Sequence, residues 1–462
     1  MTGKHLRRRT LLTTTAVAAG ALLAPAAAQA APTAQGAPTA QGAPAAPATG
    51  GGGQGPVRAL ERAAHPLRST EPGTDTADLR PLGAMIGGAK VVGLGEATHG
   101  SHEFFAMKER VFRYLVEERG FTTFALEMSW PAGLRIDEYL QGGRGDARRI
   151  VKEELGESPW EREEFVSLIE WMRDHNRRHP GHKVHFMGDD IGAPKVGDDL
   201  FARVTGYVQR QHPELLPRFT ELYTGLRPLD DSFAYLAGPL AERQRLAANA
   251  RQALELLTGR QGAGGTEFEW TVQHARSIAQ TATFLAFDLA DPAVIPVAML
   301  YRDQLMADNT AWWQRHTGHR MLLSAHNSHV GYVTDIPETY PKVQGAFLRD
   351  LLGKDYLPIG FTFDRGSFLS KDQSLGGPWK KYTVDAAGPG TNEETLDKVR
   401  HRDYYLDIRT APPAARTWLD TARPTRSIGT EYPVPLADIR IASSYDVLIH
   451  LHRIREADQL RP

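Results

Sequence analysis

The sequence of 462 residues contains no cysteine. This absence excludes disulfide bonds, thiolate catalysis and cysteine-based metal sites. The chain also lacks an excess of charge of either sign, because 54 Lys and Arg residues face 55 Asp and Glu residues. A balance so close to zero provides no general attraction to nucleic acid or to an anionic membrane. We therefore expect no nucleic-acid partner, whereas small-molecule chemistry remains open.

Long hydrophobic runs are missing too, since no segment approaches the roughly 20 apolar residues that cross a bilayer. At the N-terminus, Arg7, Arg8 and Arg9 precede a modest apolar run that ends near Leu23, and residues 28–30 fit an A-x-A cleavage site. Paired arginines before a weakly apolar region resemble a twin-arginine signal, which exports folded proteins. We expect a signal peptide over residues 1–30 and a secreted or cell-envelope protein without stable membrane insertion after cleavage. An uncleaved anchor is the alternative.

The rest of the chain divides by composition and periodicity. Residues 31–56 contain APTAQG twice and end in a Gly-rich run, which predicts a disordered linker. Strand and helix patterns alternate over residues 57–193 and 290–462, which predicts an α/β catalytic core with a mainly parallel sheet flanked by helices. Residues 194–289 show helical periodicity without a convincing strand, which predicts a helical insertion or cap. The expected strands are 90–95, 122–126, 183–187, 321–325, 356–363, 404–408 and 445–452, and the main expected helices are 102–119, 131–140, 163–179, 301–316 and 340–352.

Ionisable residues follow most of the expected strands. Parallel α/β sheets bind ligands outside the carboxyl ends of their strands, so these side chains should meet at one edge. Glu96 and His99 follow the first strand within the glycine-rich hexapeptide GEATHG, residues 95–100. Histidine titrates near neutrality and can accept a proton from water, while a nearby carboxylate fixes its tautomer. The alternative is a tight turn in which Glu96 caps the next helix.

Three further candidates follow other strands. Glu127 could orient water or hold His99, or it could form a buried salt bridge. His326 and His329 follow the strand at 321–325 and could stabilise an oxyanion, act as an acid or bind metal. One of the two histidines could instead satisfy backbone groups. We assign His99, Glu96, Glu127 and His326 to catalysis.

A second set of residues is assigned to substrate binding. Lys108 could be a counter-charge in the cavity or an ordinary surface lysine. Asp189, Asp190 and Asp446 also suit the capping of loops or helices. Arg302, Asp303 and Asp308 share one expected helix, either as a solvated face or as an ion-pair network. The substrate-binding candidates are His329, Lys108, Asp190 and Arg302, and no residue is assigned to a resident metal or cofactor.

An ordered set of segments resembles the erythromycin esterase family. These are GEATHG, HEFFAMKERVFRYLVEERGFTTFALE, HFMGDDI, MADN, SAHNSHV and YDVLIHLH, spread over about residues 80–454. The resemblance implies an α/β core with helical additions and hydrolysis of a macrolide lactone. It makes His99 the general base, matches Glu96 and Glu127 to the essential acidic residues, and matches His326 and His329 to the downstream histidine pair. Lys108 stands where some members carry Arg, so a forked, two-point contact is lost there.

The expected function is therefore an exported hydrolase that opens a lactone or related ester with His-activated water and no covalent intermediate. A metal-dependent hydrolase using His99, His326, His329 and a glutamate is one alternative. A non-catalytic exported binding protein is another. An antibiotic that acts on the ribosome is more naturally destroyed inside the cell or on entry, so an exported member need not confer antibiotic resistance.

Overall fold

The computed structural model describes residues 55–191, 195–260, 265–372 and 377–461. The predicted signal peptide and all but the last two residues of the predicted linker lie outside these ranges. The described chain begins with a helix at Gly55, two residues before the boundary expected from composition. Among the described residues, we find no helix with the length and apolar character needed to cross a membrane.

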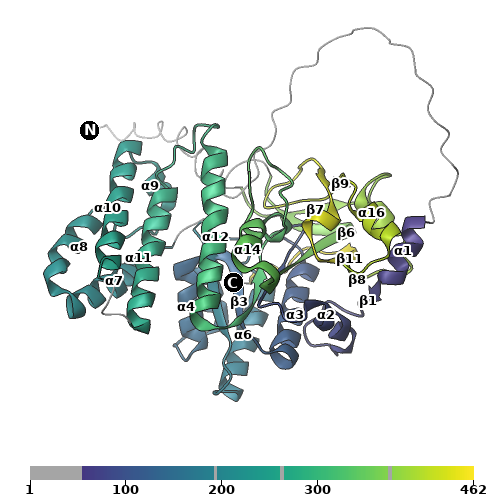
Figure 1. Ribbon diagram of the computed structural model, residues 1–462, viewed down its shortest axis with the longest axis horizontal. Helices are drawn as coiled ribbons and strands as arrows, with labels where there is room; N and C mark the ends of the chain where they lie inside the picture. Colours follow the sequence, from purple (N-terminus) through teal and green to yellow (C-terminus); the bar gives the residue numbers. More distant parts are fainter. Residues whose placement is uncertain (1–54, 192–194, 261–264, 373–376, 462) are drawn as a thin grey trace, which may run out of the picture.

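A mostly parallel sheet forms the centre of the molecule, with the order β1-β8-β11-β6-β2-β5-β3-β4 and with β7 paired to β6 (Figure 1). The segment from β11 to β4 is parallel, whereas β1, β8 and β7 pair in the antiparallel sense. The predicted fold class is thus confirmed. The strands are β1 (His65–Pro66), β2 (Val91–Leu94), β3 (Phe121–Ser129), β4 (His185–Asp190), β5 (Arg320–Ser324), β6 (Tyr356–Ser370), β7 (Lys380–Val384), β8 (Tyr404–Asp407) and β11 (Val447–Ile454), with a separate ribbon of β9 (Arg423–Thr425) and β10 (Ala437–Ile439).

Helices cover both faces of this sheet. Apolar residues of α3 and α6 pack in one core on one face, and those of α12 and α14 pack in another core against β2, β5 and β6. The helices of the α/β core are α1 (Gly55–Ala63), α2 (Arg80–Ile86), α3 (His102–Arg119), α4 (Trp130–Leu140), α5 (Ala147–Glu154), α6 (Glu163–Arg178), α12 (Ile295–Thr317), α13 (Asn327–Val330), α14 (Gln344–Leu352), α15 (Asn392–Leu396), α16 (Pro413–Leu419) and α17 (Ile441–Ser444).

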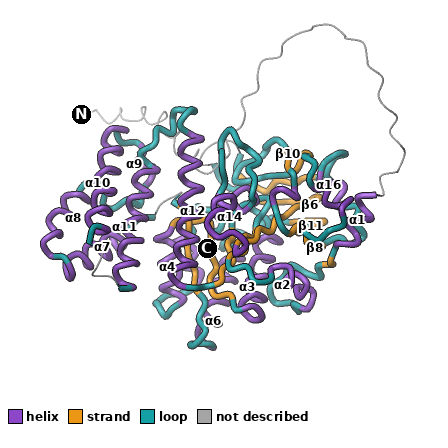
Figure 2. Tube along the Cα trace, in the orientation of Figure 1, coloured by secondary structure: helices purple, strands orange, loops and turns teal. Residues whose placement is uncertain are grey.

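The helices between β4 and α12 form a block at one end of the molecule (Figure 2). They share a hydrophobic core that is distinct from the two cores on the sheet faces, and Leu200, Ala250 and Ile278 are among its buried members. The helix α12 borders this block and also packs on the sheet (Figure 1). The block consists of α7 (Asp198–Gln211), α8 (Leu216–Tyr223), α9 (Ser232–Leu236), α10 (Leu240–Thr258) and α11 (Thr266–Phe284).

Several strands extend further than the hydrophobic pattern predicts. The strand β3 continues past Leu126 through a shift in its register with β4, so Glu127 lies inside the strand and not after it. The strand β4 likewise includes Asp189 and Asp190. These carboxylates are accommodated there because Arg302, Thr310 and Gln344 donate hydrogen bonds to them, and a pattern based on apolar residues ends too early. Helix α3, by contrast, has the predicted bounds, and Gly120 ends it with the left-handed conformation at φ 66°.

Candidate active site

The turn between β2 and α3 places Glu96 and His99 side by side. The Nδ1 atom of His99 lies 2.5 Å from Oε1 of Glu96, and both side chains are buried. Lys108, which lies on α3, donates a hydrogen bond to the other carboxylate oxygen of Glu96. Burial alone would raise the pKa of Glu96, but the charge of Lys108 and the hydrogen bond with His99 outweigh it and lower the pKa. Glu96 is therefore an anion that holds His99 through Nδ1, and this bond does not involve Nε2 of His99, a residue that lines the cavity described below.

Glu127 connects this pair to the downstream histidines. One of its oxygens accepts the backbone N–H of His326 at 2.9 Å, and the other lies 3.3 Å from Nε2 of His329. Burial opposes ionisation of Glu127, but the charges of His329, His99 and Arg302 outweigh it and lower its pKa. The carboxylate thus fixes the start of α13 relative to β3.

Helix α12 contributes a buried ion-pair network. Arg302 binds Asp190 through Nε at 2.9 Å and Nη2 at 2.5 Å, and its Nη2 also donates to Glu127 at 3.2 Å. Its neighbour Asp303 lies 2.7 Å from Nδ1 of His329 and accepts the backbone N–H of Gln344 at 2.8 Å. Of the two interpretations of this helix, the structure selects the ion-pair network for Arg302 and Asp303.

His326 and His329 have opposite protonation preferences although they lie three residues apart. Burial opposes the cation of His329, yet Asp303 and Glu127 raise its pKa to about 9. Burial lowers the pKa of His326 to about 4, and the positive field of His99 adds to that effect. The backbone N–H of Ser328 donates to Nδ1 of His326, so the neutral ring carries its hydrogen on Nε2. That buried Nε2 has no hydrogen-bond partner among the described residues.

A small cavity of about 40 Å³ lies between these groups. The rings of His99 and His326 have centroids 5.1 Å apart beside it. Two loop segments complete its wall, and Asp335 of the first loop accepts hydrogen bonds from Ser427 of the second at 2.6 Å and from Ser328 of α13 at 3.0 Å. The lining residues are His99, Glu127, Arg302, His326, Ser328, His329, Ile336, Tyr340, Ser427 and Gly429.

The structure thus gathers most of the predicted site residues but gives them different positions. His99, Glu127, His326, His329 and Arg302 line the cavity. The remaining three candidates, Glu96, Lys108 and Asp190, stand behind the lining and are held by ion pairs to one another or to Arg302.

Other candidates from the sequence lie apart from the lining. Asp189 is buried behind it and accepts hydrogen bonds from Gln344 and Thr310. Asp446 bonds to Tyr332 at the opposite edge of the sheet. Ser427, Asp335 and Tyr340 were not foreseen, because they come from loops without a regular pattern. Ser328 could have been found, since it lies between the two histidines.

The nitrogen atoms of the histidines bear on the metal-dependent alternative. Both nitrogens of His329 face carboxylates, and Nδ1 of His99 and of His326 are each engaged. In the parts of the chain that the structure describes, the groups whose ligand atoms converge within 4.8 Å are elsewhere. They are His102 with Glu164 and Asp458, and Asp364 with Asp397 and His452. The geometry around His99 therefore suits proton transfer better than metal ligation.

Comparisons with known proteins agree with this fold. The model of the erythromycin esterase family matches residues 116–454, a span that begins after GEATHG. Erythromycin esterase type II of Escherichia coli is 24% identical over 384 residues, which cover 75% of this chain and 87% of that protein.

Two solved structures extend the comparison. A protein from Bacillus cereus has a TM-score of 0.80 and 30% identity, covering 88% of this chain and 98% of that one. A mutant of the erythromycin esterase EreC in its open conformation has the same fold, with a TM-score of 0.66, 18% identity, and coverage of 85% and 98%. Because the family model spans most of the sequence, this chain belongs to the erythromycin esterase family.

Proposed function

We propose that the protein hydrolyses a carboxylic ester, of the lactone class, by direct attack of a water molecule that His99 activates. One observation carries the proposal. His99 is held by Glu96 through Nδ1, and its ring lies beside His326, whose Nε2–H has no partner among the described residues. A base and an unused hydrogen-bond donor therefore border one small cavity.

The reaction follows from these two groups. Water in the cavity attacks the ester carbonyl carbon as its proton passes to Nε2 of His99, and Glu96 stabilises the imidazolium through Nδ1. The carbonyl oxygen becomes an oxyanion that accepts a hydrogen bond from Nε2 of His326. The tetrahedral intermediate then breaks its bond to the alcohol oxygen, which takes the proton from His99. The products are a carboxylic acid and an alcohol, joined in one molecule when the substrate is a lactone.

Replacing His99 by Asn tests the proposal. The variant should lose about 10²–10⁴-fold in kcat on a panel of esters, because general-base catalysis is worth that factor. An exposed histidine, His182, provides the matched control, and His182→Asn should retain the parental rate. Unchanged turnover in His99→Asn would refute the role of this residue. A parent protein that binds esters without hydrolysing any of them would favour the binding-protein alternative.

The proposed substrate class is a macrolide or a related lactone. Its support is the family assignment and the name of the Escherichia coli relative, which is an erythromycin esterase. Incubation of the purified protein with several macrolides and simple lactones, followed by mass spectrometry, should show a gain of one water per ring opened. Hydrolysis of simple lactones together with failure on every macrolide would support the proposed hydrolase activity and contradict the proposed macrolide substrate.

We also propose that the protein is exported through a twin-arginine-type signal. The support is the sequence of residues 1–30 alone, which lie outside the described structure. Replacing Arg8 and Arg9 by Lys should keep the protein inside the cell, and fractionation followed by immunoblotting measures this. Export that persists unchanged in the double variant would contradict the proposal.

A further inference from the structure

A second cavity lies where the parallel strands begin, at the opposite edge of the sheet from the carboxyl ends that carry Glu96 and His326. Its volume is about 980 Å³, which is in the range of small-molecule pockets. Ala89 precedes β2, Tyr356 begins β6 and Asp446 precedes β11 at this edge. A ligand bound here would be separated from His99 by the length of β2, roughly 13 Å at about 3.3 Å per residue.

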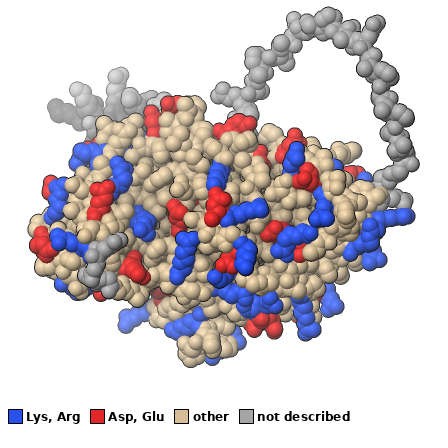
Figure 3. Space-filling view, viewed as in Figure 1, with Lys and Arg blue, Asp and Glu red and all other residues tan. Residues whose placement is uncertain are grey.

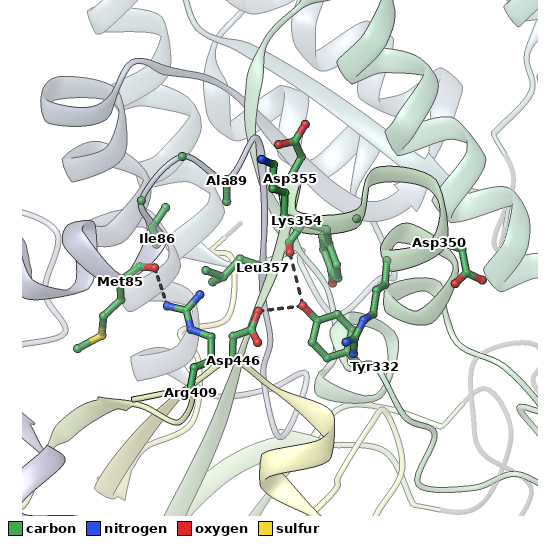
Figure 4. A pocket seen from close by; sticks show the side chains of 15 residues that line it. Met85, Ile86, Ala89, Tyr332, Asp350, Lys354, Asp355, Leu357, Arg409 and Asp446 are labelled. Atoms are coloured by element: carbon green, nitrogen blue, oxygen red, sulfur yellow. Dashed lines mark hydrogen bonds between the residues drawn. The ribbon is translucent and has the colours of Figure 1, made fainter. Parts of the chain in front are cut away.

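The side chains of the cavity are both apolar and charged. Ile86 and Leu357 provide buried apolar surface. Asp446 accepts a hydrogen bond from the hydroxyl of Tyr332 at 2.8 Å (Figure 4). The guanidinium of Arg349 lies over the ring of the same tyrosine, 4.3 Å from its centroid. One tyrosine therefore contacts both charges, the carboxylate of Asp446 through its hydroxyl and the guanidinium of Arg349 through the face of its ring.

Pairing of the surrounding charges leaves an excess of positive charge. Three carboxylates at the rim already have cationic partners, which are Lys90 for Asp355, Lys342 for Asp350 and Arg409 for Asp407. Among the described residues, Arg349 and Lys354 have no carboxylate within 4.0 Å. Asp446 is half-buried, and burial raises its pKa although Tyr332, Arg409 and Arg349 oppose that effect. The cavity thus offers two cations with no carboxylate of the described chain in contact, Arg349 and Lys354, and one half-buried carboxylate, Asp446.

We propose that this cavity binds a small organic carboxylate that carries a hydroxyl or ammonium group at its other end. The ligand's carboxylate binds Arg349 and Lys354, its hydroxyl or ammonium donates to Asp446, and its apolar chain covers Ile86 and Leu357. A simple anion lacks a donor for Asp446, and a simple cation is repelled by Arg349. Ring opening of a lactone also yields a hydroxy acid, although binding here requires no turnover at His99.

Arg409 and Tyr332, the polar groups beside Asp446, are held in place before a ligand arrives. Arg409 is fixed by Asp407 and by the carbonyl oxygen of Met85, to which it donates at 2.7 Å (Figure 4). The hydroxyl of Tyr332 lies 2.8 Å from Asp446 and 3.5 Å from the carbonyl oxygen of Tyr356. Groups that are already ordered lose little conformational entropy on binding, which favours the site over a random surface patch.

Ligand-observed NMR titration of the full protein tests the proposal with four probes of equal chain length. These are terminal hydroxyhexanoate, aminohexanoate, hexanoate and hexanediol. The first two should bind at least several-fold more tightly than the last two. Arg349→Met should weaken binding of both by about tenfold, the effect of one charge-assisted hydrogen bond. Asp446→Asn keeps an acceptor for Tyr332 but should weaken aminohexanoate more than hydroxyhexanoate.

Two variants locate the binding. Arg177→Met removes a comparably exposed arginine on α6 and should leave all four affinities unchanged. His99→Ala should also bind as the parent does, which separates this cavity from the proposed active site. The proposal is overturned by equal binding of the four probes, by their failure to bind, by parental binding in Arg349→Met, or by loss of binding in His99→Ala.

Discussion

At the scale of single residues, the arrangement around Glu96 distinguishes His99, the proposed base, from the groups that hold it in place. Lys108 binds one oxygen of the Glu96 carboxylate and stabilises its negative charge. The other oxygen can therefore accept a hydrogen bond from His99 while Glu96 stays ionised. Arg302 does the same for Asp190 and Glu127. Glu96, Asp190 and Glu127 thus each have a cationic partner, which a buried ion requires because isolated burial costs several kcal/mol.

Ser328 lines the cavity, and its role distinguishes direct attack by water from a mechanism with a covalent intermediate. Its oxygen lies 3.1 Å from Nδ1 of His326, but its single proton is donated to Asp335 at 3.0 Å. Nδ1 of His326 already accepts the backbone N–H of Ser328, so this ring is not placed to deprotonate the hydroxyl. We expect Ser328→Ala to keep kcat within about tenfold of the parent, well short of the about 10⁶-fold loss that follows removal of a nucleophile. Hydrolysis in ¹⁸O-labelled water and mass spectrometry of the protein during turnover measure this. An ester adduct on Ser328 would exclude direct attack.

Asp303 sets the charge of His329, and this predicts a pH dependence. His329 has a pKa of about 9, raised above its ordinary value, so its cation is present below that pH and is lost above it. The groups that face it are Asp303, Glu127, Arg302 and the ring of Tyr340. We expect kcat/KM to fall as the pH rises through about 9. Asp303→Asn removes the strongest charge that supports the cation, so the fall should move toward neutral pH.

Asp308 on the same helix supplies the control for this profile. It does not line the cavity, and Asp308→Asn should keep the alkaline limb of the parent. An alkaline limb that is identical in the parent and in Asp303→Asn would show that the charge of His329 does not matter for turnover.

At the scale of elements, the turn from β2 to α3 depends on close approach to β6. A Cβ atom at Gly100 would overlap the backbone of Leu369, whose N–H donates to the Gly100 carbonyl at 2.9 Å. Gly100→Ala should therefore destabilise the protein by about 1–3 kcal/mol, the usual cost of overpacking, and should displace His99. Denaturant unfolding and ester turnover measure the two effects.

Gly181 offers a matched glycine for that experiment. An added Cβ there meets no heavy atom within 4 Å, so Gly181→Ala should change stability by less than about 0.5 kcal/mol. Equal stabilities for the two variants would contradict the tight packing of this turn.

Much of the fold and part of the site could be predicted from the sequence at this scale. The strands are recognisable as apolar runs and helix α3 by its helical spacing, and Glu96 lies two residues after the end of β2. The order of the strands could not be read, because β5 inserts between β2 and β3 although more than 190 residues separate it from β3. The ion-pair network of α12 was ambiguous, since a polar helical face has the same pattern whether water or Glu127 covers it.

At the scale of the whole molecule, His102 ties together distant parts of the chain. Its Nδ1 lies 2.7 Å from Glu164 on α6, and its Nε2 lies 3.0 Å from Glu71 near the start of the described chain. Asp458 near the other end lies 3.8 Å away. The contacts of His102 therefore link segments that are far apart in the sequence, as a disulfide does in other proteins, in a chain that has no cysteine.

The ion pairs of His102 with Glu164 and Glu71 predict how the stability of the protein varies with pH. Burial opposes its cation, but Glu164 and Glu71 raise the pKa from 6.5 to about 9 in the folded protein. The folded pKa is the higher one, so the stabilisation is complete below about pH 6.5 and is lost as the pH rises through about 9. Denaturant unfolding should give a smaller difference between pH 6 and pH 9 for His102→Gln than for the parent. His182→Gln should keep the parental difference.

The charged side chains on one face of the surface are distributed evenly. On the face seen in Figure 3, acidic and basic side chains are interspersed, without a broad area of one sign. A substrate approaching that face meets no strong field, so its encounter rate should depend little on ionic strength.

The loops that Asp335 joins limit the turnover rate of the proposed reaction. A space of about 40 Å³ holds a water molecule but not a lactone ring, so a substrate of the proposed class requires this wall to move outward. Such a motion would break the hydrogen bonds that Asp335 accepts from Ser328 and Ser427. Turnover therefore cannot exceed the frequency of that motion, whatever the reactivity of the ester, and a fast substrate and a slow one converge on the same ceiling.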